Sequence, residues 1–232
     1  MQISISNAIG GGGGAKGGTP AFSNTKSILL DGIDDRVDVT PVSVTGNEFS
    51  VSFWMKPSSF NNRGPVGSNT PNILSIHIYT SSTIRLYLQG GSNVTLFNFG
   101  GNLMTLNQWQ HIIICRDSNN VTKCYRNGVL FNDGGATSVV NGTFHLNYIG
   151  ARNSVNTFNG SLDEVAYWDS DQSANASAIY NSGVPASLDT YNPLGWWRCG
   201  DDDTAPTLTD NGSGGNDGTM INFSTFSTDV PT

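Results

Sequence analysis

The sequence is poor in charged residues, which make up 12% of it, and it contains only two glutamates, Glu48 and Glu164. Helix-forming residues are scarce, whereas glycine, with 28 residues, is abundant. That composition is typical of short strands joined by turns. No apolar run is long enough to cross a membrane, and no basic and apolar leader follows Met1. We therefore expect neither a transmembrane segment nor a secretory signal.

Basic residues are also few, since 11 Lys and Arg stand against 18 Asp and Glu and the formal net charge is −7. A chain without a basic face is not expected to bind nucleic acid. The three cysteines, Cys115, Cys124 and Cys199, match no zinc spacing. A two-residue turn at Asn119–Asn120 would place Cys115 opposite Cys124, as a disulfide requires. The missing secretory signal favours the alternative, reduced thiols in the core.

Alternating apolar and polar residues predict strands along most of the chain. We expect them at 26–30, 36–40, 49–55, 73–79, 83–89, 94–99, 109–116, 121–126 and 129–131, with a hairpin over 144–168 and a loop over 58–72. In the segment FSVSFWM, Phe49, Val51, Phe53 and Met55 share one face. Ser173 is expected to cap a short helix over 174–180. The prediction is one all-β domain, an antiparallel two-sheet sandwich with one short helix.

The two ends of the chain differ from this pattern. Residues 1–25 form a glycine-rich arm whose ordering costs more backbone entropy than its side chains recover. We expect a neighbouring subunit to hold the arm, the alternative being that it packs on its own domain. Trp196 and Trp197 need burial, so residues 187–232 are expected to add closing strands to a jelly roll that spans 26–232.

Four segments in order resemble the laminin-G-like jelly rolls of the concanavalin A-like lectin and glucanase superfamily. They are LDGIDDRV at 30–37, FSVSFWMKP at 49–57, WQH at 109–111 with YRNGVL at 125–130, and IG at 149–150 with FNGSLDEVAYW at 158–168. The resemblance covers about residues 26–186 and implies a two-sheet antiparallel jelly roll. Residues 194–219 look like the segment that normally leads such domains, which implies a circular permutation.

The most suggestive chemical group is acidic: Asp31, Asp34 and Asp35 in one turn, together with Asp163. Hard oxygen ligands from several side chains are what Ca²⁺ requires, and members of the resembled family often carry calcium. These four residues are therefore candidate metal ligands. In the alternative interpretation, Asp31 and Asp163 accept backbone N–H groups and fix turns.

The resemblance also implies glycoside hydrolysis as a hypothesis, because glucanases of the superfamily use paired carboxylates. The segment LDEVAYW at 162–168 lacks their Glu-x-Asp-x-Glu pattern. Asp163 and Glu164 are adjacent, so a regular strand would point them to opposite faces. We assign no catalytic residue and expect no enzyme. The contacts to a glycan stay undefined, although aromatic rings and Asn-rich loops are available.

These observations favour a non-catalytic structural or adhesion protein of a viral particle, such as a phage capsid decoration or fibre, with glycan binding as an open addition. It would assemble in the host cytoplasm as a homo-oligomer. Residues 1–25 would contact other virion subunits, surface glycans are candidate partners, and neither nucleic acid nor membrane is expected. The alternative is a free carbohydrate-binding lectin with Ca²⁺, and a glycoside hydrolase is the third hypothesis.

Overall fold

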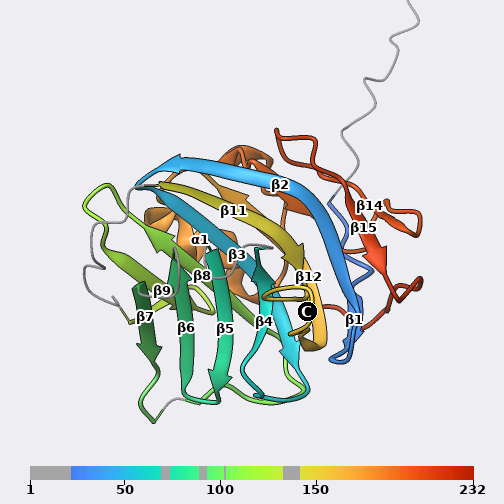
Figure 1. Cartoon of the computed structure of the whole chain (residues 1–232), viewed down its shortest axis with the longest axis horizontal. Coiled ribbons are helices and arrows are strands. Elements are labelled where there is room, and N and C mark those ends of the chain that lie inside the picture. Colours follow the sequence, from blue (N-terminus) through green and yellow to red (C-terminus); the bar gives the residue numbers. More distant parts are fainter. Residues whose placement is uncertain (1–21, 69–73, 89–92, 102, 133–141) are drawn as a thin grey trace, which may run out of the picture.

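The computed structural model describes residues 22–68, 74–88, 93–101, 103–132 and 142–232, so most of the predicted arm lies outside the described residues. Two antiparallel sheets pack face to face into a sandwich (Figure 1). The first sheet has the order β1 (Ile28–Asp31), β12 (Asn159–Trp168), β3 (Phe49–Pro57), β8 (Gln110–Arg116), β9 (Thr122–Arg126), β10 (Val129–Asn132), and β13 (Gly195–Trp197) also pairs with β12.

The second sheet has eight strands and includes the curved β2 that crosses the top of Figure 1. Its order is β14 (Thr207–Leu208), β15 (Gly218–Ile221), β2 (Arg36–Gly46), β11 (Gly142–Ile149), β4 (Arg63–Gly67), β5 (Leu74–Thr80), β6 (Thr83–Leu88), β7 (Asn93–Asn98). No helix among the described residues is long and apolar enough to span a membrane.

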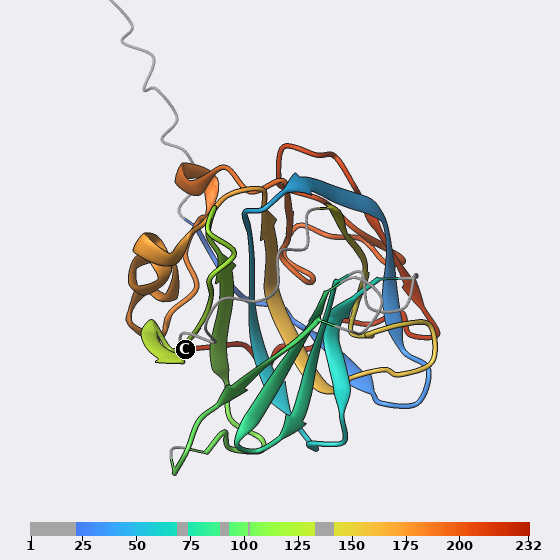
Figure 2. The same cartoon turned by 60° about the vertical axis from the view of Figure 1, so that its left-hand side comes forward.

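Strand periodicity sets which side chains fill the space between the sheets. Phe49, Val51, Phe53 and Met55 of β3 all belong to the central core, as their alternation predicts. The intervening residues of β3 point to the outer side, where a second apolar cluster lies. That cluster is covered by α1 (Ala176–Tyr180) and the segments around it, which Figure 2 shows beside this sheet. The predicted sandwich and its short helix are confirmed.

The predicted hairpin over 144–168 is wrong, because β11 and β12 lie in different sheets. β11 pairs with β2 and β4, whereas β12 lies between β1 and β3. The connection crosses from one sheet to the other and turns at Gly150, whose φ is +80°. Alternation indicates which face of a strand is buried, but it does not identify the strand's neighbours.

Three further local expectations need correction. Residues 63–67, expected inside a loop, form β4, which pairs with β5 and β11. The register opposes Cys115 to Lys123 and Cys124 to Ile114, so the two thiols point to opposite faces and all three cysteines are free and buried. A longer turn than the predicted one, closed by Asp117, causes this shift. Ser173 begins a 3₁₀ turn, and no side chain caps the helix.

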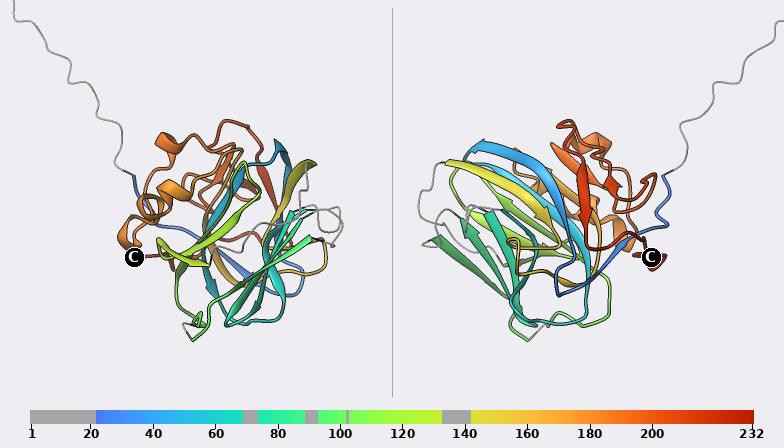
Figure 3. Two further views of the ribbon diagram at one scale, coloured as in Figure 1. Left: turned by 90° about the vertical axis from the view of Figure 1, so that its left-hand side faces the viewer. Right: turned by 45° about the vertical axis from the view of Figure 1, so that its right-hand side comes forward.

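The last part of the chain contributes to both sheets. Trp196 in β13 pairs with Ala166 of β12, and β15 pairs with β2. Near the other end, Ser27 forms an antiparallel bridge with Ser227, so the start of the described chain lies beside its C-terminal segment (Figure 3). This closure brings residues 22–26, which we call the arm root, onto the outer side of β12.

Candidate functional site

A β-bulge in β12 shapes the site. The strand advances three residues, from Asp163 to Ala166, while its partner β3 advances two, and Glu164 has a φ of +46°. Leu162 and Val165 both point into the central core, whereas Ala166 belongs to the outer cluster. The extra residue therefore places Asp163 and Glu164 on the same, outer side. This corrects the expectation that the two carboxyl groups face opposite ways.

Both carboxyl groups are buried and hydrogen-bonded. Asp163 accepts from Asn24 Nδ2 at 2.9 Å, while Glu164 accepts from Trp196 Nε1 at 2.6 Å and from Arg198 Nε at 3.3 Å. Burial raises the pKa of Glu164 to about 7, although Arg198 acts in the opposite direction. Burial and the neighbouring Glu164 also raise the pKa of Asp163. The two carboxyl groups therefore lie beneath the surface, where they bind protein donors.

The arm root is held over this pair by residues 196–201, which begin the segment that we call the tail (196–232). Phe22 stacks on Trp196 with ring centroids 6.3 Å apart, and the guanidinium carbon of Arg198 lies 4.4 Å from the Phe22 centroid. Arg198 also donates a hydrogen bond to the carbonyl oxygen of Ser23. Thr25 donates its backbone N–H and its hydroxyl to Asp201. Residues 22–26 thus pack on their own domain.

A cleft of about 600 Å³ opens between the arm root and the tail, and we call it the arm-root cleft. Its lining comes from three distant parts of the sequence: Phe22, Ser23, Thr25, Lys26, Ser187, Asp189, Trp196, Arg198, Gly200, Asp201, Asp202 and Asn211. Asp189, Asp202 and Asn211 are exposed there. An aromatic face beside carboxylate, amide and guanidinium groups suits a ligand that has both an apolar face and several hydroxyl groups.

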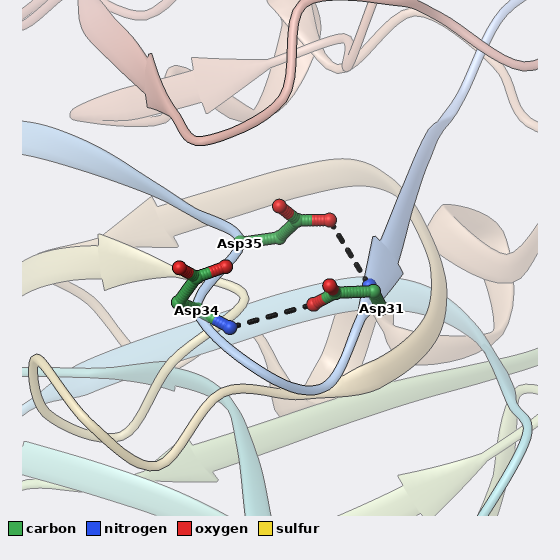
Figure 4. A group of neighbouring side chains, drawn as sticks. All are labelled: Asp31, Asp34 and Asp35. Carbon is green, nitrogen blue, oxygen red and sulfur yellow. Dashed lines mark hydrogen bonds between the residues drawn. The ribbon is translucent and has the colours of Figure 1, made fainter.

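The acidic turn between β1 and β2 is a second, separate candidate site. One oxygen from each of Asp31, Asp34 and Asp35 lies within 4.8 Å of the others, and Figure 4 shows the three carboxylates gathered around the turn. Asp31 Oδ1 accepts the N–H of Ile33 at 2.7 Å and Asp35 Oδ2 accepts the N–H of Asp31 at 3.1 Å. The fourth candidate, Asp163, does not join them, since it is buried with Asn24.

The donor set of this turn fits a hard cation. Asp31 and Asp34 are exposed. Burial raises the pKa of Asp35, and the charges of Asp31 and Asp34 raise it further. The remaining carboxylate oxygens leave the turn rich in unneutralised negative charge, as an oxygen-liganded divalent ion requires. Some of the oxygens also fix the turn, so the two interpretations of these aspartates are compatible.

Ser52 and His111, which lie under α1, are the residue types of a nucleophile and its base, but both side chains are buried. Ser52 Oγ lies 2.7 Å from His111 Nε2, and each residue is 1% exposed. Burial lowers the pKa of His111 to about 3. Trp54 packs on Tyr180 of the helix above them. Because both side chains are buried, we assign the pair to the packing between the sheet and the helix.

Comparison with known proteins assigns this fold to a family. The sequence profile of the concanavalin A-like lectin/glucanases superfamily matches residues 31–176, more than half of the chain. The chain therefore belongs to this superfamily, as its motifs indicate. The matched span leaves out residues 187–232, so the circular permutation stays a prediction. No curated protein sequence matches the chain.

Many solved structures share the fold, and two of them are compared with it below. A candidate carbohydrate-binding protein from Bacteroides ovatus aligns with a TM-score of 0.58 and 16% identity over 87% of this chain, which spans 62% of that protein's length. A heptameric SAP-like pentraxin from Limulus polyphemus aligns with a TM-score of 0.51 and 17% identity, covering 68% of this chain and 82% of the pentraxin. At such identities the likeness shows a lectin-like jelly roll and nothing finer.

Proposed function

We propose that this protein is a non-catalytic carbohydrate-binding protein and that its glycan site is the arm-root cleft. The observation that carries the proposal is the meeting of Phe22, Arg198 and three exposed polar side chains around one cleft of about 600 Å³. The apolar face of a pyranose packs against an aromatic ring, while carboxylate and amide groups bind its hydroxyls. Membership of a lectin-like superfamily supports this use of the fold.

The positions of Asp163 and of the two glutamates support binding rather than hydrolysis. A glycosidase needs two carboxyl groups that reach opposite sides of a glycosidic bond. Asp163 is fully buried and Glu164 is 3% exposed, and protein donors hold both groups. The remaining glutamate, Glu48, lies at the turn between β2 and β3, away from the cleft lining. Neither glutamate is therefore placed to act on a sugar in the arm-root cleft.

A panel of neutral glycans, followed by calorimetric titration of the best binder, tests the proposal. Phe22→Ala should weaken binding at least tenfold, because a central aromatic contact commonly contributes more than about 1.4 kcal/mol. Tyr148→Ala is the matched control, since it removes a half-buried ring of the other sheet that does not line the cleft, and it should leave affinity within about twofold. Failure of every neutral glycan to bind, or equal losses in the two variants, would contradict the assignment.

Calcium at the acidic turn is the second part of the proposal. Asp31, Asp34 and Asp35 would supply carboxylate ligands, and the ion would neutralise their mutual repulsion and stiffen the connection between β1 and β2. The turn lies apart from the cleft lining. Calcium is therefore proposed to stabilise the domain rather than to contact the glycan.

The predicted role in a viral particle, as a capsid decoration or fibre, depends on the glycine-rich arm. Residues 1–21 of that arm lie outside the described residues, and the arm root contacts its own domain. The virion role, assembly in the host cytoplasm and homo-oligomerisation stay predictions. Sedimentation of the purified chain tests the last of them, because a monomer at high concentration would contradict it.

A further inference from the structure

The acidic residues of this chain are distributed very unevenly. The formal net charge is −7, yet residues 49–116 contain no aspartate or glutamate, and residues 134–162 contain none either. The first stretch supplies β4, β5, β6 and β7 of the eight-stranded sheet, and the second supplies β11 and the connection that follows it. Five adjacent strands of one sheet therefore carry no carboxylate side chain, which leaves their arginines without local acidic partners.

Arginines and aromatic rings form a continuous layer on the outer face of these strands. The guanidinium carbon of Arg85 lies 3.2 Å from the centroid of Tyr79, and Arg85 Nη1 donates to the Tyr87 hydroxyl at 3.3 Å. Tyr87 stacks on His77 with centroids 4.3 Å apart, and Arg152 Nη1 lies 3.2 Å from His77 Nδ1. The alternate residues of β5 and β6 point into the core, so this layer faces outward.

The positive charges of the layer are not neutralised. Within the described part of the chain, no ion pair is formed by Arg63, Arg85 or Arg152. Burial lowers the pKa of Arg152, and the positive charge of Arg63, at the start of β4, lowers it further. Like charges placed together repel one another, and an anion bound between them would remove that repulsion.

Two buried donors in the layer also have no acceptor among the described residues. They are Arg85 Nε and Nε2 of His77, a side chain that is 2% exposed. Because Arg152 donates to His77 Nδ1, the neutral ring carries its proton on Nε2, where it can only donate. Burial and the charges of Arg152 and Arg85 lower the pKa of His77 to about 3, so the ring is neutral. Unpaired buried donors are costly, and an oxyanion would satisfy them.

We propose that this surface, which we call the arginine face, binds an anionic saccharide through its sulfate or carboxylate groups. Guanidinium groups bind both oxyanions in a bidentate manner. The exposed edge of Tyr79 and the exposed Leu96 of β7 offer apolar surface to a sugar ring. The chain's net charge of −7 repels any long polyanion, so a short oligosaccharide that reaches only this surface is favoured over a nucleic acid. The arginine face lies on the opposite sheet from the arm-root cleft, and the inference does not depend on that cleft.

Titration of the full chain with two anionic oligosaccharides, one sulfated (from heparin) and one carboxylated (from polygalacturonate), tests the inference. We expect at least one to bind at low salt, and the preferred one identifies the oxyanion. Arg85→Gln and Arg152→Gln should each weaken binding about tenfold or more. Arg36→Gln is the matched control: it makes the same charge change on the same sheet, but Arg36 is paired with Asp38 at 2.7 Å. Its effect should stay within about twofold.

Three results would overturn the inference. The first is that neither oligosaccharide binds. The second is that Arg36→Gln weakens binding as much as Arg85→Gln does. The third is that an oligothymidine of equal charge competes as well as the oligosaccharide. Arg152 contacts His77 whereas Arg85 donates to Tyr87, so Arg152→Gln remains informative if Arg85→Gln fails to fold. Phe22→Ala separates the two sites, because it should reduce neutral glycan binding and leave anionic binding unchanged.

Discussion

Glu164→Gln removes a buried carboxyl group that titrates while preserving the size of the side chain. The folded protein raises the pKa of Glu164 from 4.5 to about 7, chiefly by burial and in spite of Arg198. The unfolded chain therefore loses this proton near pH 4.5, whereas the folded chain holds it until about pH 7. In that window the unfolded state binds fewer protons, so the contribution of Glu164 to the free energy of unfolding falls as pH rises.

The size of the effect follows from the two pKa values. A difference of about 2.5 corresponds to about 3 kcal/mol, since one pKa unit is about 1.4 kcal/mol. The contribution is fully present below pH 4.5 and is lost by about pH 8. Glutamine does not titrate, so the stability of the variant relative to the wild type should rise by about 3 kcal/mol between these limits. Glu164 also adds to the effect of burial on the pKa of Asp163, which is raised, so the variant lowers that pKa as well.

Urea unfolding of both proteins from pH 4.5 to 8 measures this difference. The wild-type curve alone is not diagnostic, because burial lowers the pKa values of His77 and His111 to about 3. These histidines remove stability as the pH falls below 6.5, which is the opposite trend. They are common to both proteins and cancel in the difference. Glu48→Gln, at a partly exposed turn, is the control and should change stability by less than about 0.5 kcal/mol at every pH. A difference that is flat, or that falls with pH, would refute the reasoning.

Two further predictions concern the scaffold. Gly160→Ala should cost more than about 2 kcal/mol, because a Cβ there would lie 2.2 Å from the carbonyl oxygen of Lys56 at a φ of +136°. Gly46→Ala has a similar φ of +128° but open space around it, so it should cost less in the same denaturation experiment, and equal losses would contradict the packing argument. Calcium should raise the melting temperature of the EDTA-treated protein and have a smaller effect on Asp34→Asn, whereas an equal rise in both would exclude the acidic turn as the metal site.

Much of the fold is readable from the sequence because its signals are local. The faces of β3 and the turn after β1 depend on residues that are neighbours in the chain. Sheet membership is different, since nothing in the alternation of β11 tells that it pairs with β2 rather than with β12. The predicted pairing of Cys115 with Cys124 is wrong for the same reason, because one additional turn residue moves one of the two side chains to the other face.

The candidate sites divide along the same line. The three aspartates of the acidic turn are close in the sequence, so the sequence alone predicts them as a group. The arm-root cleft joins Phe22, Asp189 and Asn211, which only the closed sandwich brings together. The bulge did leave a signal, because core residues at Leu162 and Val165 are three apart and break strict alternation. That spacing indicates an extra residue between them, and it places both carboxyl groups on the side of the cleft.

The indole N–H resonances of the five tryptophans provide the most direct test of the central claim, that a glycan binds in the arm-root cleft. Trp196 lines the cleft, and its Nε1 donates to Glu164, whereas Trp54 lies under α1. During titration with the best neutral glycan, the Trp196 signal should shift in a saturable manner while the Trp54 signal stays in place. A saturable binding curve that leaves the Trp196 signal unmoved would contradict the account.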